Sequence, residues 1–470
     1  MYDVIIIGGG PGGYLAGERL GHAKKKALLV EEAHVGGTCL NVGCVPTKTL
    51  LHAAKLFVHA KEAARFGVTA SGVAYDWAKI QAWKAEVVEK LRAGIAAQEK
   101  RLGVEVVSGR GEILARPSGS VPARVGVIGA DGKRAEYEAR AVLVSTGSAP
   151  FVPPIPGAKD NLRVVDSTGL LSIPAVPRRL VVIGGGVIGV EFAGLFSSLG
   201  TEVAVIEMMD EIIPFMDKEI APLYRKAMPG VEFRLGCKVD KIDGGTVYFT
   251  GKNGKQEAKE GDVVLMAVGR RPVLQGWGTE AAGVGVTAKG VTVDGRMRTN
   301  IPGIWAAGDV TGLSLLAHSA YRMAEVAVAD MLRFLNGPGG LNGTKAPNNV
   351  WRSSAVPWAV YGLPEAAGVG MTEQEAAAKG VAVLKASVPL VYSGRFVAEN
   401  TFAAPGVIKV IASAQTRAML GVHALGAYSS EFIWGAAALI ENELRVEDVK
   451  ELIFPHPTVG ELIRDAVWML

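Results

Sequence analysis

The strongest constraint on the fold is a sequence pattern that occurs twice in the chain. Residues 4–13 read VIIIGGGPGG and residues 180–189 read LVVIGGGVIG, so in each copy an apolar, β-branched run leads into G-x-G-x-x-G. The glycines of this pattern are Gly8, Gly10 and Gly13 in the first copy, and Gly184, Gly186 and Gly189 in the second. The first glycine permits a tight turn, the second lets the backbone approach a pyrophosphate, and the third lets a helix pack on the strand. The repeat therefore predicts two Rossmann-like units, each with a dinucleotide at a helix N-terminus.

An acidic residue at the end of the next strand supports both predictions. Ala27–Val30 leads to Glu31 and Val203–Ile206 leads to Glu207, and both carboxylates follow the first glycine by 23 residues (31 − 8 = 23 and 207 − 184 = 23). A carboxylate here accepts hydrogen bonds from the adenosine ribose and repels a 2′-phosphate. Since methionines and no arginine follow Glu207, the second site is predicted to bind NAD and not NADP. Two packing turns with chance acidic residues are the alternative, and the matched spacings argue against it.

A pair of cysteines follows the first glycine pattern. Cys39 and Cys44 lie within Gly36–Lys48, which reads GGTCLNVGCVPTK. On an ideal helix, residues five apart are separated by about 7.5 Å along the axis, so a disulfide here requires a distorted helix start at Asn41 and Gly43. Such a disulfide suits reversible opening, and an inert reduced pair is the alternative. A second Cys/His pair at zinc-ligand spacing is lacking, so no metal site is predicted. Because redox cysteines follow the first site directly, that site is predicted to hold FAD.

Composition narrows the function classes. The chain has 470 residues and a net charge of +4, which predicts two to four domains and argues against nucleic-acid binding. The sequence has neither a signal peptide pattern nor an apolar span of the length that crosses a bilayer. A cytoplasmic protein without membrane contact is expected, the alternative being an organelle protein whose leader has been removed. The third cysteine, Cys237, is expected to be a small buried hydrophobe in a strand over Phe233–Val239.

Taken together, these motifs resemble the class I pyridine nucleotide–disulfide oxidoreductases and, within them, the dihydrolipoamide dehydrogenases, over the whole chain. Gly36–Lys48 is similar to the redox-disulfide motif of the family, Ser145–Ser148 to its flavin turn, and Gly269–Pro272 to the end of its NAD domain. Thr299–Val310 is similar to the second FAD motif, and Leu315–His318 follows it as in the family.

The resemblance implies an α/β fold with two Rossmann-like domains and a C-terminal α+β dimerisation domain. The expected segments are the FAD-binding domain at 1–149, the inserted NAD-binding domain at 150–272, the second, central part of the FAD-binding domain at 273–346 and the interface domain at 347–470. A long, amphipathic and exposed helix is expected over 78–101 on the FAD domain, and a Gly/Pro/Asn-rich loop over 336–349.

The resemblance also assigns cofactor contacts. Residues expected to contact FAD are Gly8, Gly10, Gly13, Glu31, Gly37, Thr38, Lys48, Gly111, Thr146, Gly147, Ser148, Gly308, Asp309, Leu316, Ala317 and His318. Residues expected to contact NAD are Gly184, Gly186, Val187, Ile188, Gly189, Glu191, Glu207, Val239 and Gly269. Lys48, one turn after Cys44, is expected to stabilise negative charge on the reduced flavin and to pair with Glu191, the alternative being a solvated helix lysine. For His318 the alternative is a helix cap.

Near the C-terminus, His456 precedes Glu461 by five residues in FPHPTVGE. Taken alone, a histidine between two prolines is more often a turn residue than a catalyst. In the family this segment is an acid/base dyad that reaches the disulfide of the other subunit. The resemblance therefore implies a homodimer in which His456 takes a proton from a dithiol while Glu461 orients its ring. The His456–Pro457 bond is also a candidate cis peptide.

The implied reaction is the oxidation of protein-bound dihydrolipoyl groups, with Cys39 meeting the substrate, Cys44 beside the flavin, and NAD as the final acceptor. Implied partners are lipoyl domains of 2-oxo acid dehydrogenase complexes or a glycine-cleavage lipoyl carrier. Three departures from the family pattern, Val350–Gly362 with its two tryptophans, Phe454 and Gly460, leave the substrate open.

Other members of the family, and one other class of protein, share some of these motifs. An NAD(P)H-dependent reductase of another low-molecular-weight disulfide is the main alternative. Glutathione-type reductases use NADPH, which Glu207 disfavours, and mercuric reductases need cysteines beyond Cys237. A non-catalytic, flavin-bound scaffold subunit would be expected to lack the cysteine pair or the dyad.

Overall fold

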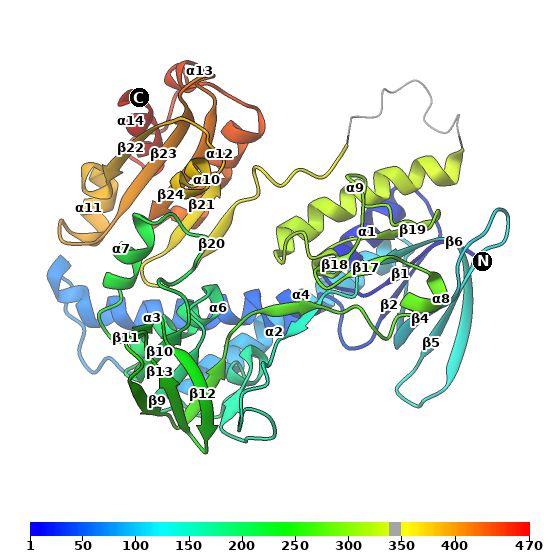
Figure 1. Cartoon of the computed structure of the whole chain (residues 1–470), viewed down its shortest axis with the longest axis horizontal. Coiled ribbons are helices and arrows are strands. Elements are labelled where there is room, and N and C mark those ends of the chain that lie inside the picture. The colour runs from blue at the N-terminus through cyan, green and yellow to red at the C-terminus, as the bar shows by residue number, and fades with distance from the viewer. Residues whose placement is uncertain (338–348) are drawn as a thin grey trace. The chain divides into compact units, whose positions relative to one another are not determined.

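The computed structural model describes residues 1–337 and 349–470, and Figure 1 shows the course of the chain. It divides into two compact units. Unit 1 comprises residues 1–49, 81–151 and 270–352, and unit 2 comprises residues 50–80, 152–269 and 353–470. Most of the loop expected over 336–349 lies outside the described residues.

Unit 1 is built on a seven-stranded sheet. Along the sheet the strands are β3 (Glu105–Ser108), β2 (Ala27–Glu31), β1 (Tyr2–Ile7), β6 (Arg134–Val144), β5 (Ala123–Ile128) and β4 (Arg110–Ala115), and β19 (Ile304–Ala306) also pairs with β6. The strands from β3 to β6, and β19, run parallel, whereas β5 and β4 continue the sheet in antiparallel hairpins.

The apolar run of β1 is buried on both faces, as a parallel strand between two layers must be. Val4 and Ile6 pack in the core that contains Met323 of helix α9 (Ala317–Asn336). Ile5 and Ile7 point to the opposite face. Helix α1 (Pro11–His22) lies beside α9 (Figure 1), so the glycine pattern leads from a central strand into a covered helix.

The remaining elements of unit 1 are shorter or are shared with unit 2. They are α2 (Gly37–Val42), α3 (Cys44–Glu62), α4 (Trp77–Arg101), β7 (Ser148–Pro150) paired with β16 (Arg270–Pro272), α8 (Thr279–Ala282), β17 (Val286–Thr287), β18 (Gly290–Val291) and the 3₁₀ turn η2 (Asp309–Thr311). Both α3 and α4 have residues in each unit. The helix expected over 78–101 is thus confirmed as α4.

Unit 2 repeats the parallel arrangement. Its first sheet has the order β11 (Val231–Leu235), β10 (Glu202–Glu207), β9 (Arg179–Ile183), β15 (Val263–Met266) and β8 (Val164–Val165), and all of its pairs are parallel. The order β11-β10-β9-β15 corresponds to β3-β2-β1-β6 of unit 1, so the two copies of the glycine motif lie in sheets of the same topology. Helix α6 (Val187–Ser198) follows β9 as α1 follows β1.

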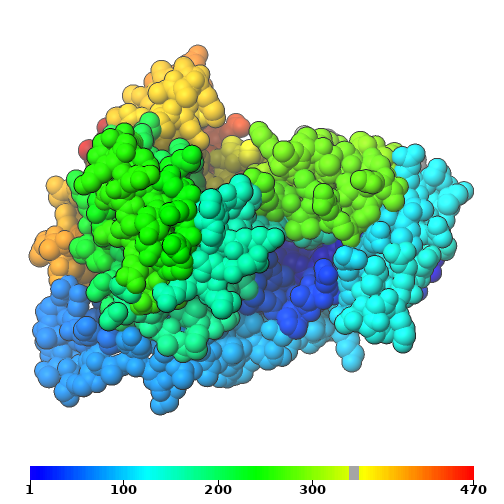
Figure 2. Space-filling model, turned by 60° about the horizontal axis from the view of Figure 1, so that its bottom comes forward, coloured from blue at the N-terminus to red at the C-terminus, as the bar shows by residue number. Residues whose placement is uncertain are grey.

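Further elements of this part of unit 2 are short helices, a turn and a meander. They are the turn η1 (Ala63–Phe66), α5 (Ser167–Leu170), α7 (Ile220–Lys226) and an antiparallel meander of β12 (Lys238–Asp243), β13 (Thr246–Thr250) and β14 (Gln256–Glu260). The strands and helices from β9 to β15 form the green surface in Figure 2. Cys237 lies between β11 and β12, so the strand expected to contain it is wrong, although the side chain is buried as expected. The chain must turn at Gly236, which has φ = 64°.

The C-terminal part of unit 2 is an antiparallel sheet with helices. The sheet order is β20 (Trp358–Val360), β21 (Ala366–Gly370), β24 (Met419–Leu425), β23 (Val407–Ser413) and β22 (Val383–Pro389). The helices and turns are α10 (Glu373–Ala378), η3 (Leu390–Tyr392), α11 (Gly394–Asn400), α12 (Ser429–Glu441), α13 (Val446–Lys450) and α14 (Leu462–Trp468). The predicted cis peptide at His456–Pro457 is confirmed, and Leu363–Pro364 is also cis.

No helix within residues 1–337 and 349–470 has the length and apolar character needed to cross a bilayer. In the same residues, no three His, Cys, Asp or Glu side chains are grouped so that they could hold a metal ion.

One buried carboxyl in unit 1 makes stability depend on pH. Glu99 of α4 is 0% exposed and its oxygens have no hydrogen-bond partner. Burial, with the charge of Glu18 second, raises the pKa of Glu99 from 4.5 to about 8. A carboxyl whose pKa is raised by folding prefers to stay protonated, so stability falls as the pH rises from about 4.5 to about 8.

We therefore expect Glu99→Gln to stabilise the protein more at pH 8.5 than at pH 6, by roughly 2–3 kcal/mol, since one pH unit corresponds to about 1.4 kcal/mol. The measurement is thermal unfolding of variant and wild type at both pH values. Glu89→Gln is the matched control, because Glu89 lies on the same helix with 67% of its side chain exposed. An equal gain at both pH values would show that Glu99 does not titrate in this range.

Candidate functional site

The first glycine turn joins β1 to α1 and has the geometry of a pyrophosphate cradle. Gly8 has φ = 103°, and a Cβ there would lie 2.3 Å from the carbonyl oxygen of Ser145. A Cβ on Gly13 would lie 1.8 Å from the oxygen of Gly8, so helix and strand approach too closely for a side chain. A Cβ on Gly10 would have only the Cα of Gly37 within contact range, at 3.8 Å. The middle glycine therefore faces space that a phosphate group fits.

The second glycine turn repeats this geometry between β9 and α6. Gly184 has φ = 106°, and a Cβ there would lie 2.5 Å from the oxygen of Ala267. A Cβ on Gly189 would lie 2.0 Å from the oxygen of Gly184, whereas a Cβ on Gly186 would meet nothing within 4 Å. Neither α1 nor α6 has a side-chain cap, and Val187 and Ile188 form the first turn of α6. Backbone amides at both helix starts are thus suited to bind phosphates.

The two acidic residues occupy equivalent positions. Glu31 accepts hydrogen bonds from Gly9 N at 2.6 Å and from Ala33 N at 2.8 Å. Glu207 accepts hydrogen bonds from Gly185 N at 2.5 Å and from Met209 N at 2.6 Å. Each carboxylate thus bridges the glycine turn and the segment after the strand. In this orientation it stands beside the turn, where an adenosine ribose would lie.

The other predicted flavin contacts gather at the carboxyl ends of β1, β6 and β19. Ser148 donates a hydrogen bond to Asp309 at 2.6 Å, and Arg270 Nε donates to Ser148 Oγ at 2.8 Å. The same guanidinium donates to Thr38 Oγ1 at 3.4 Å. Burial raises the pKa of Asp309, while the bond from Ser148 opposes this effect. The role of Arg270 as a link between these groups was not predicted, because the contact joins residues 122 positions apart.

The rest of the flavin turn is tied to the chain after β16. Thr146 Oγ1 donates to the oxygen of Val273 at 3.1 Å, and Val273 N donates to the oxygen of Gly147 at 3.0 Å. A Cβ on Gly308 would lie 3.3 Å from Ala320 of α9. Leu316 is the N-cap of α9, and Ala317 and His318 form its first turn. These residues therefore surround the same end of the unit 1 sheet.

Three further predicted contacts, at Gly111, Val239 and Gly269, lie in or beside other elements. Gly111 is in β4, where a Cβ would lie 3.0 Å from Ile7 and 3.2 Å from Val30, so sheet packing alone accounts for a glycine. Val239 is in β12, and Gly269, with φ = 116°, directly precedes β16.

The cysteine pair lies where one helix ends and another begins. Cys39 is in α2, Gly43 interrupts the helix, and Cys44 opens α3, so the predicted distortion is confirmed. Asn41 Nδ2 donates to the oxygen of Gly37 at 2.9 Å, and Arg92 of α4 donates to Asn41 Oδ1 at 3.0 Å. These bonds hold the turn that brings the two sulfurs together.

Both cysteines are thiols in this structure. A hydrogen bond between them, followed by burial, raises the pKa of Cys39, and the positive charge of Lys48 acts in the opposite direction. A thiol in this state needs a base before it can act as a nucleophile.

Glu191, in the helix that follows the second glycine turn, makes a contact that was not predicted. Glu191 of α6 accepts a hydrogen bond from Tyr361 N at 2.9 Å. Its pairing with Lys48 stays a prediction, since the two residues belong to different units.

The C-terminal dyad is formed as predicted in its geometry. His456 Nδ1 and Glu461 Oε2 are 2.9 Å apart, and Glu461 Oε1 accepts a hydrogen bond from Thr458 N at 3.0 Å. The imidazole is 78% exposed, whereas the carboxylate is 16% exposed. Glu461 is therefore fixed by the turn and holds one ring nitrogen, while the ring itself projects outward.

The departures near the dyad have local explanations. A Cβ on Gly460 would lie 3.1 Å from Cβ of Phe432, so glycine accommodates the α12 side chain. Phe454 packs on the C-terminal core. Neither residue removes a contact of the dyad.

Comparison with known families gives two matches along the chain. The model described as pyridine nucleotide-disulphide oxidoreductase matches residues 2–329, and that described as its dimerisation domain matches residues 356–467.

Similar curated proteins share nearly the whole chain. A dihydrolipoyl dehydrogenase of Thermus scotoductus is 40% identical and covers 99% of this chain and 96% of its own. Dihydrolipoyl dehydrogenase 3 of Pseudomonas putida is 37% identical, with coverage of 99% and 97%.

Solved structures give the same picture of the fold. LpdA of Mycobacterium tuberculosis superimposes with a TM-score of 0.88 at 28% identity, covering 100% of this chain and 99% of its own. The HOCl-induced flavoprotein disulfide reductase RclA of Escherichia coli superimposes with a TM-score of 0.83 at 29% identity, covering all of both chains.

Proposed function

Since the chain belongs to the pyridine nucleotide-disulphide oxidoreductase family, we propose that it is a dihydrolipoyl dehydrogenase, which oxidises protein-bound dihydrolipoyl groups and reduces NAD. The protein is a flavoprotein oxidoreductase that uses FAD and NAD. Residues 356–467 form its dimerisation domain, which supports a homodimer.

We assign the two glycine turns to the two cofactors. The turn at Gly8–Gly13 would hold FAD, because the same unit contains Cys39, Cys44 and Lys48. The turn at Gly184–Gly189 would hold NAD, with Glu207 on the ribose. This assignment corresponds to an FAD-binding domain at 1–149 and 273–346, an NAD-binding domain at 150–272 and an interface domain at 347–470, a division supported by the three principal sheets.

The residues of the chain perform the thiol chemistry. One sulfur of the substrate dithiol, deprotonated at Nε2 of His456, attacks Cys39 of the oxidised pair, and Cys44 leaves as a thiolate. The second substrate thiol then attacks the first substrate sulfur, which closes the substrate disulfide and releases Cys39, and the departing Cys39 sulfur takes the proton of that second thiol. One disulfide is thus formed for the one that is broken. FAD, when bound, supplies the two-electron chemistry that connects the reduced cysteines to NAD. Glu461 orients the imidazole, and Lys48 offsets negative charge near the thiols.

The exposed dyad is the observation that carries this proposal. The imidazole is 78% exposed and its Nδ1 is held by Glu461, which leaves Nε2 open to a reacting group from another chain and supports a base that serves the disulfide of a second subunit. The proposed partners are lipoyl domains of 2-oxo acid dehydrogenase complexes or a glycine-cleavage lipoyl carrier. A cytoplasmic location is proposed because a reducing compartment suits a redox-active cysteine pair.

The substrate class can be tested in the reducing direction. The purified flavoprotein, with NADH as reductant, would be assayed with lipoamide, a lipoylated domain, glutathione disulfide and cystine. The proposal expects kcat/KM for lipoyl substrates to exceed the other values by roughly a hundredfold or more. Faster reduction of another disulfide would favour the alternative of a different low-molecular-weight disulfide reductase.

Nucleotide selectivity gives a separate prediction at Glu207. Glu207→Gln is expected to lower kcat/KM for NAD by roughly tenfold to a hundredfold, because it loses a charged acceptor for ribose hydroxyls, and to narrow the preference over NADP. The measurement is steady-state kinetics with both nucleotides. Glu31→Gln is the matched control, since it makes the same change in the other turn and is expected to weaken FAD retention without altering nucleotide preference. If Glu207→Gln leaves the ratio of kcat/KM for NAD to that for NADP unchanged, Glu207 does not contact the adenosine ribose.

A further inference from the structure

The segment Met208–Glu219, which follows Glu207, is fixed to the glycine turn at its start. Met209 N donates to Glu207 at 2.6 Å, and Ile213 N donates to the oxygen of Gly185 at 2.9 Å. Ile213 is fully buried and has φ = 46°, a left-handed conformation that is costly for a β-branched residue. Such a conformation persists only where the surroundings hold it. The start of the segment therefore shares one hydrogen-bond network with Glu207 and the glycine turn.

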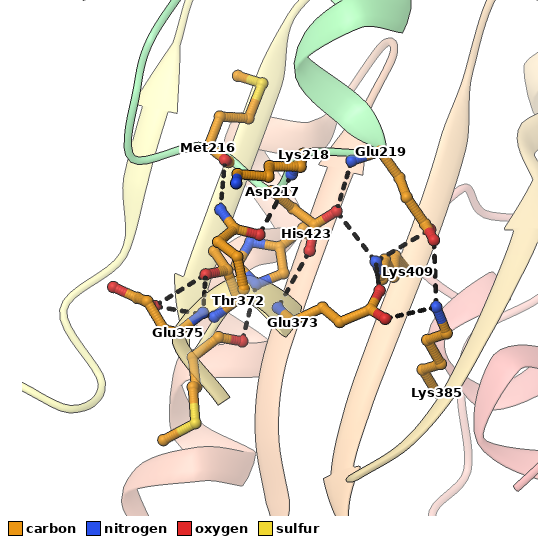
Figure 3. A network of polar contacts seen from close by, with 12 residues as sticks. Met216, Asp217, Lys218, Glu219, Thr372, Glu373, Glu375, Lys385, Lys409 and His423 are labelled. Carbon is orange, nitrogen blue, oxygen red and sulfur yellow. Dashed lines mark hydrogen bonds and ion pairs between the residues drawn. The ribbon is translucent and has the colours of Figure 1, made fainter. Parts of the chain in front are cut away.

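The end of the segment is fixed by a buried lysine of the C-terminal sheet. Lys409 in β23 has 1% of its side chain exposed, and its Nζ lies 3.0 Å from Asp217, 2.9 Å from Glu219 and 2.7 Å from Glu373 (Figure 3). Asp217 is equally buried. Removing one partner from such a buried pair leaves an uncompensated charge, so the contact resists separation.

Helix α10 adds direct bonds to the same segment. Gln374 Nε2 donates to the oxygen of Met216 at 2.8 Å, and Lys218 N donates to Gln374 Oε1 at 3.3 Å. Glu373 N donates to Asp217 at 3.2 Å (Figure 3). The start of α10 is itself fixed by a capping box of Thr372 and Glu375. The end of the segment is therefore bound to a rigid part of the C-terminal sheet.

An aromatic contact joins the middle of the segment to β20. The rings of Phe215 and Trp358 meet edge to face, with centroids 5.3 Å apart and an interplanar angle of 81°. Trp358 belongs to the region that departs from the family pattern. A Cβ on Gly368 would lie 2.5 Å from the Trp358 ring, so β21 provides a flat surface on which the indole rests. Such pairs contribute about 0.5–1.5 kcal/mol beyond their buried area.

We propose that Lys409 and Trp358 are positioning residues for NAD, because they fix the segment that shares its hydrogen bonds with Glu207. The proposal rests on the assignment of NAD to the second glycine turn. Loosening the segment would weaken the hold on the adenosine half and leave the thiol chemistry at Cys39 unchanged. The expected result is a higher KM for NAD at nearly constant kcat.

Two sets of variants test this. Phe215→Ala, Trp358→Ala and their double variant remove the aromatic contact; Phe215 is 48% exposed, which favours retention of the fold. Lys409→Met with Asp217→Asn removes both buried charges together. The matched control is Lys385→Met, which loses ion pairs with Glu219 and Glu373 from a side chain that is 44% exposed.

We expect KM for NAD to rise roughly fivefold to twentyfold in both sets, with kcat and KM for dihydrolipoamide within about twofold of wild type. For the control Lys385→Met, kcat and both KM values are expected to stay within about twofold of wild type. The two aromatic single variants should be non-additive, since each removes the same contact.

An unchanged KM for NAD in the aromatic variants would overturn the proposal. So would a general loss of function, in which FAD retention falls and the KM values for NAD and for dihydrolipoamide rise to the same extent. If the Lys409→Met, Asp217→Asn variant does not fold, the aromatic variants alone still test the positioning role. Glu207→Gln distinguishes a failure of the positioning role from a failure of the NAD assignment. If it raises KM for NAD and the positioning variants do not, only the positioning role fails; if it too has no effect, the NAD assignment fails.

Discussion

Replacement of Cys44 with serine is expected to abolish NAD reduction by dihydrolipoamide, with a loss in kcat of roughly a thousandfold or more. Serine cannot form the disulfide that accepts the electrons of the substrate. The position is also structurally particular, because Cys44 opens α3 directly after the break at Gly43 and shares a hydrogen bond with Cys39. Rates would be measured alongside absorbance, since loss of the thiolate also removes the long-wavelength band that such a group gives beside flavin.

Cys237→Ser is the matched control for this variant. Cys237 is buried between β11 and β12, where its Sγ lies 3.5 Å from the oxygen of Leu235, a contact that serine can keep. We expect its kcat to stay within about twofold of wild type. If Cys44→Ser keeps more than about a tenth of the activity, electrons do not pass through this pair.

The second large effect is expected at the exposed base. His456→Gln should lower kcat by roughly 10²–10⁴-fold, which is the usual contribution of a positioned general base. The substrate thiol must lose its proton before it attacks Cys39, and an ordinary thiol, with a pKa of about 8.5, is mostly protonated near neutral pH. Higher pH favours deprotonation without a base, and the deficit of the variant should therefore narrow as the pH rises. His22→Gln, at the exposed end of α1, is the control.

Mixed dimers test whether the base comes from the partner subunit. A dimer of one Cys44→Ser subunit and one His456→Gln subunit has one site with both intact groups only if each site uses the histidine of the other chain. Random pairing of equal amounts would then restore about a quarter of wild-type activity. An absence of recovery would show that His456 serves its own chain.

Much of the architecture follows from short-range patterns. The glycine turns, the following helices and the acidic strand ends depend on residues within about one βαβ unit, which is why the spacing of Glu31 and Glu207 predicted matching contacts. The predicted family, α/β fold, enzyme class and use of FAD and NAD are confirmed by the comparisons. The individual site residues and domain limits stay predictions.

The features that were not predicted depend on contacts between distant residues. From the sequence, a lysine in a strand is expected to face solvent. Lys409 is buried because Asp217 and Glu373, which are distant in the sequence, form ion pairs with it. Similarly, Glu99 lies in a helix that was expected to be exposed, yet the packing of α4 on Gly17 buries its carboxyl. The wrong strand around Cys237 reflects a turn at Gly236 within a segment whose apolar and polar residues alternate as in one continuous strand.

We propose that electrons pass in this protein from a dihydrolipoyl dithiol, through one cysteine pair and FAD, to NAD. The most direct test is a steady-state assay of the purified yellow protein with dihydrolipoamide and either NAD or NADP. We predict NADH formation that saturates in both substrates, and a kcat/KM for NAD that exceeds the value for NADP by roughly a hundredfold. Turnover with NADP alone, or no turnover with either free dihydrolipoamide or a reduced lipoyl domain, would contradict it.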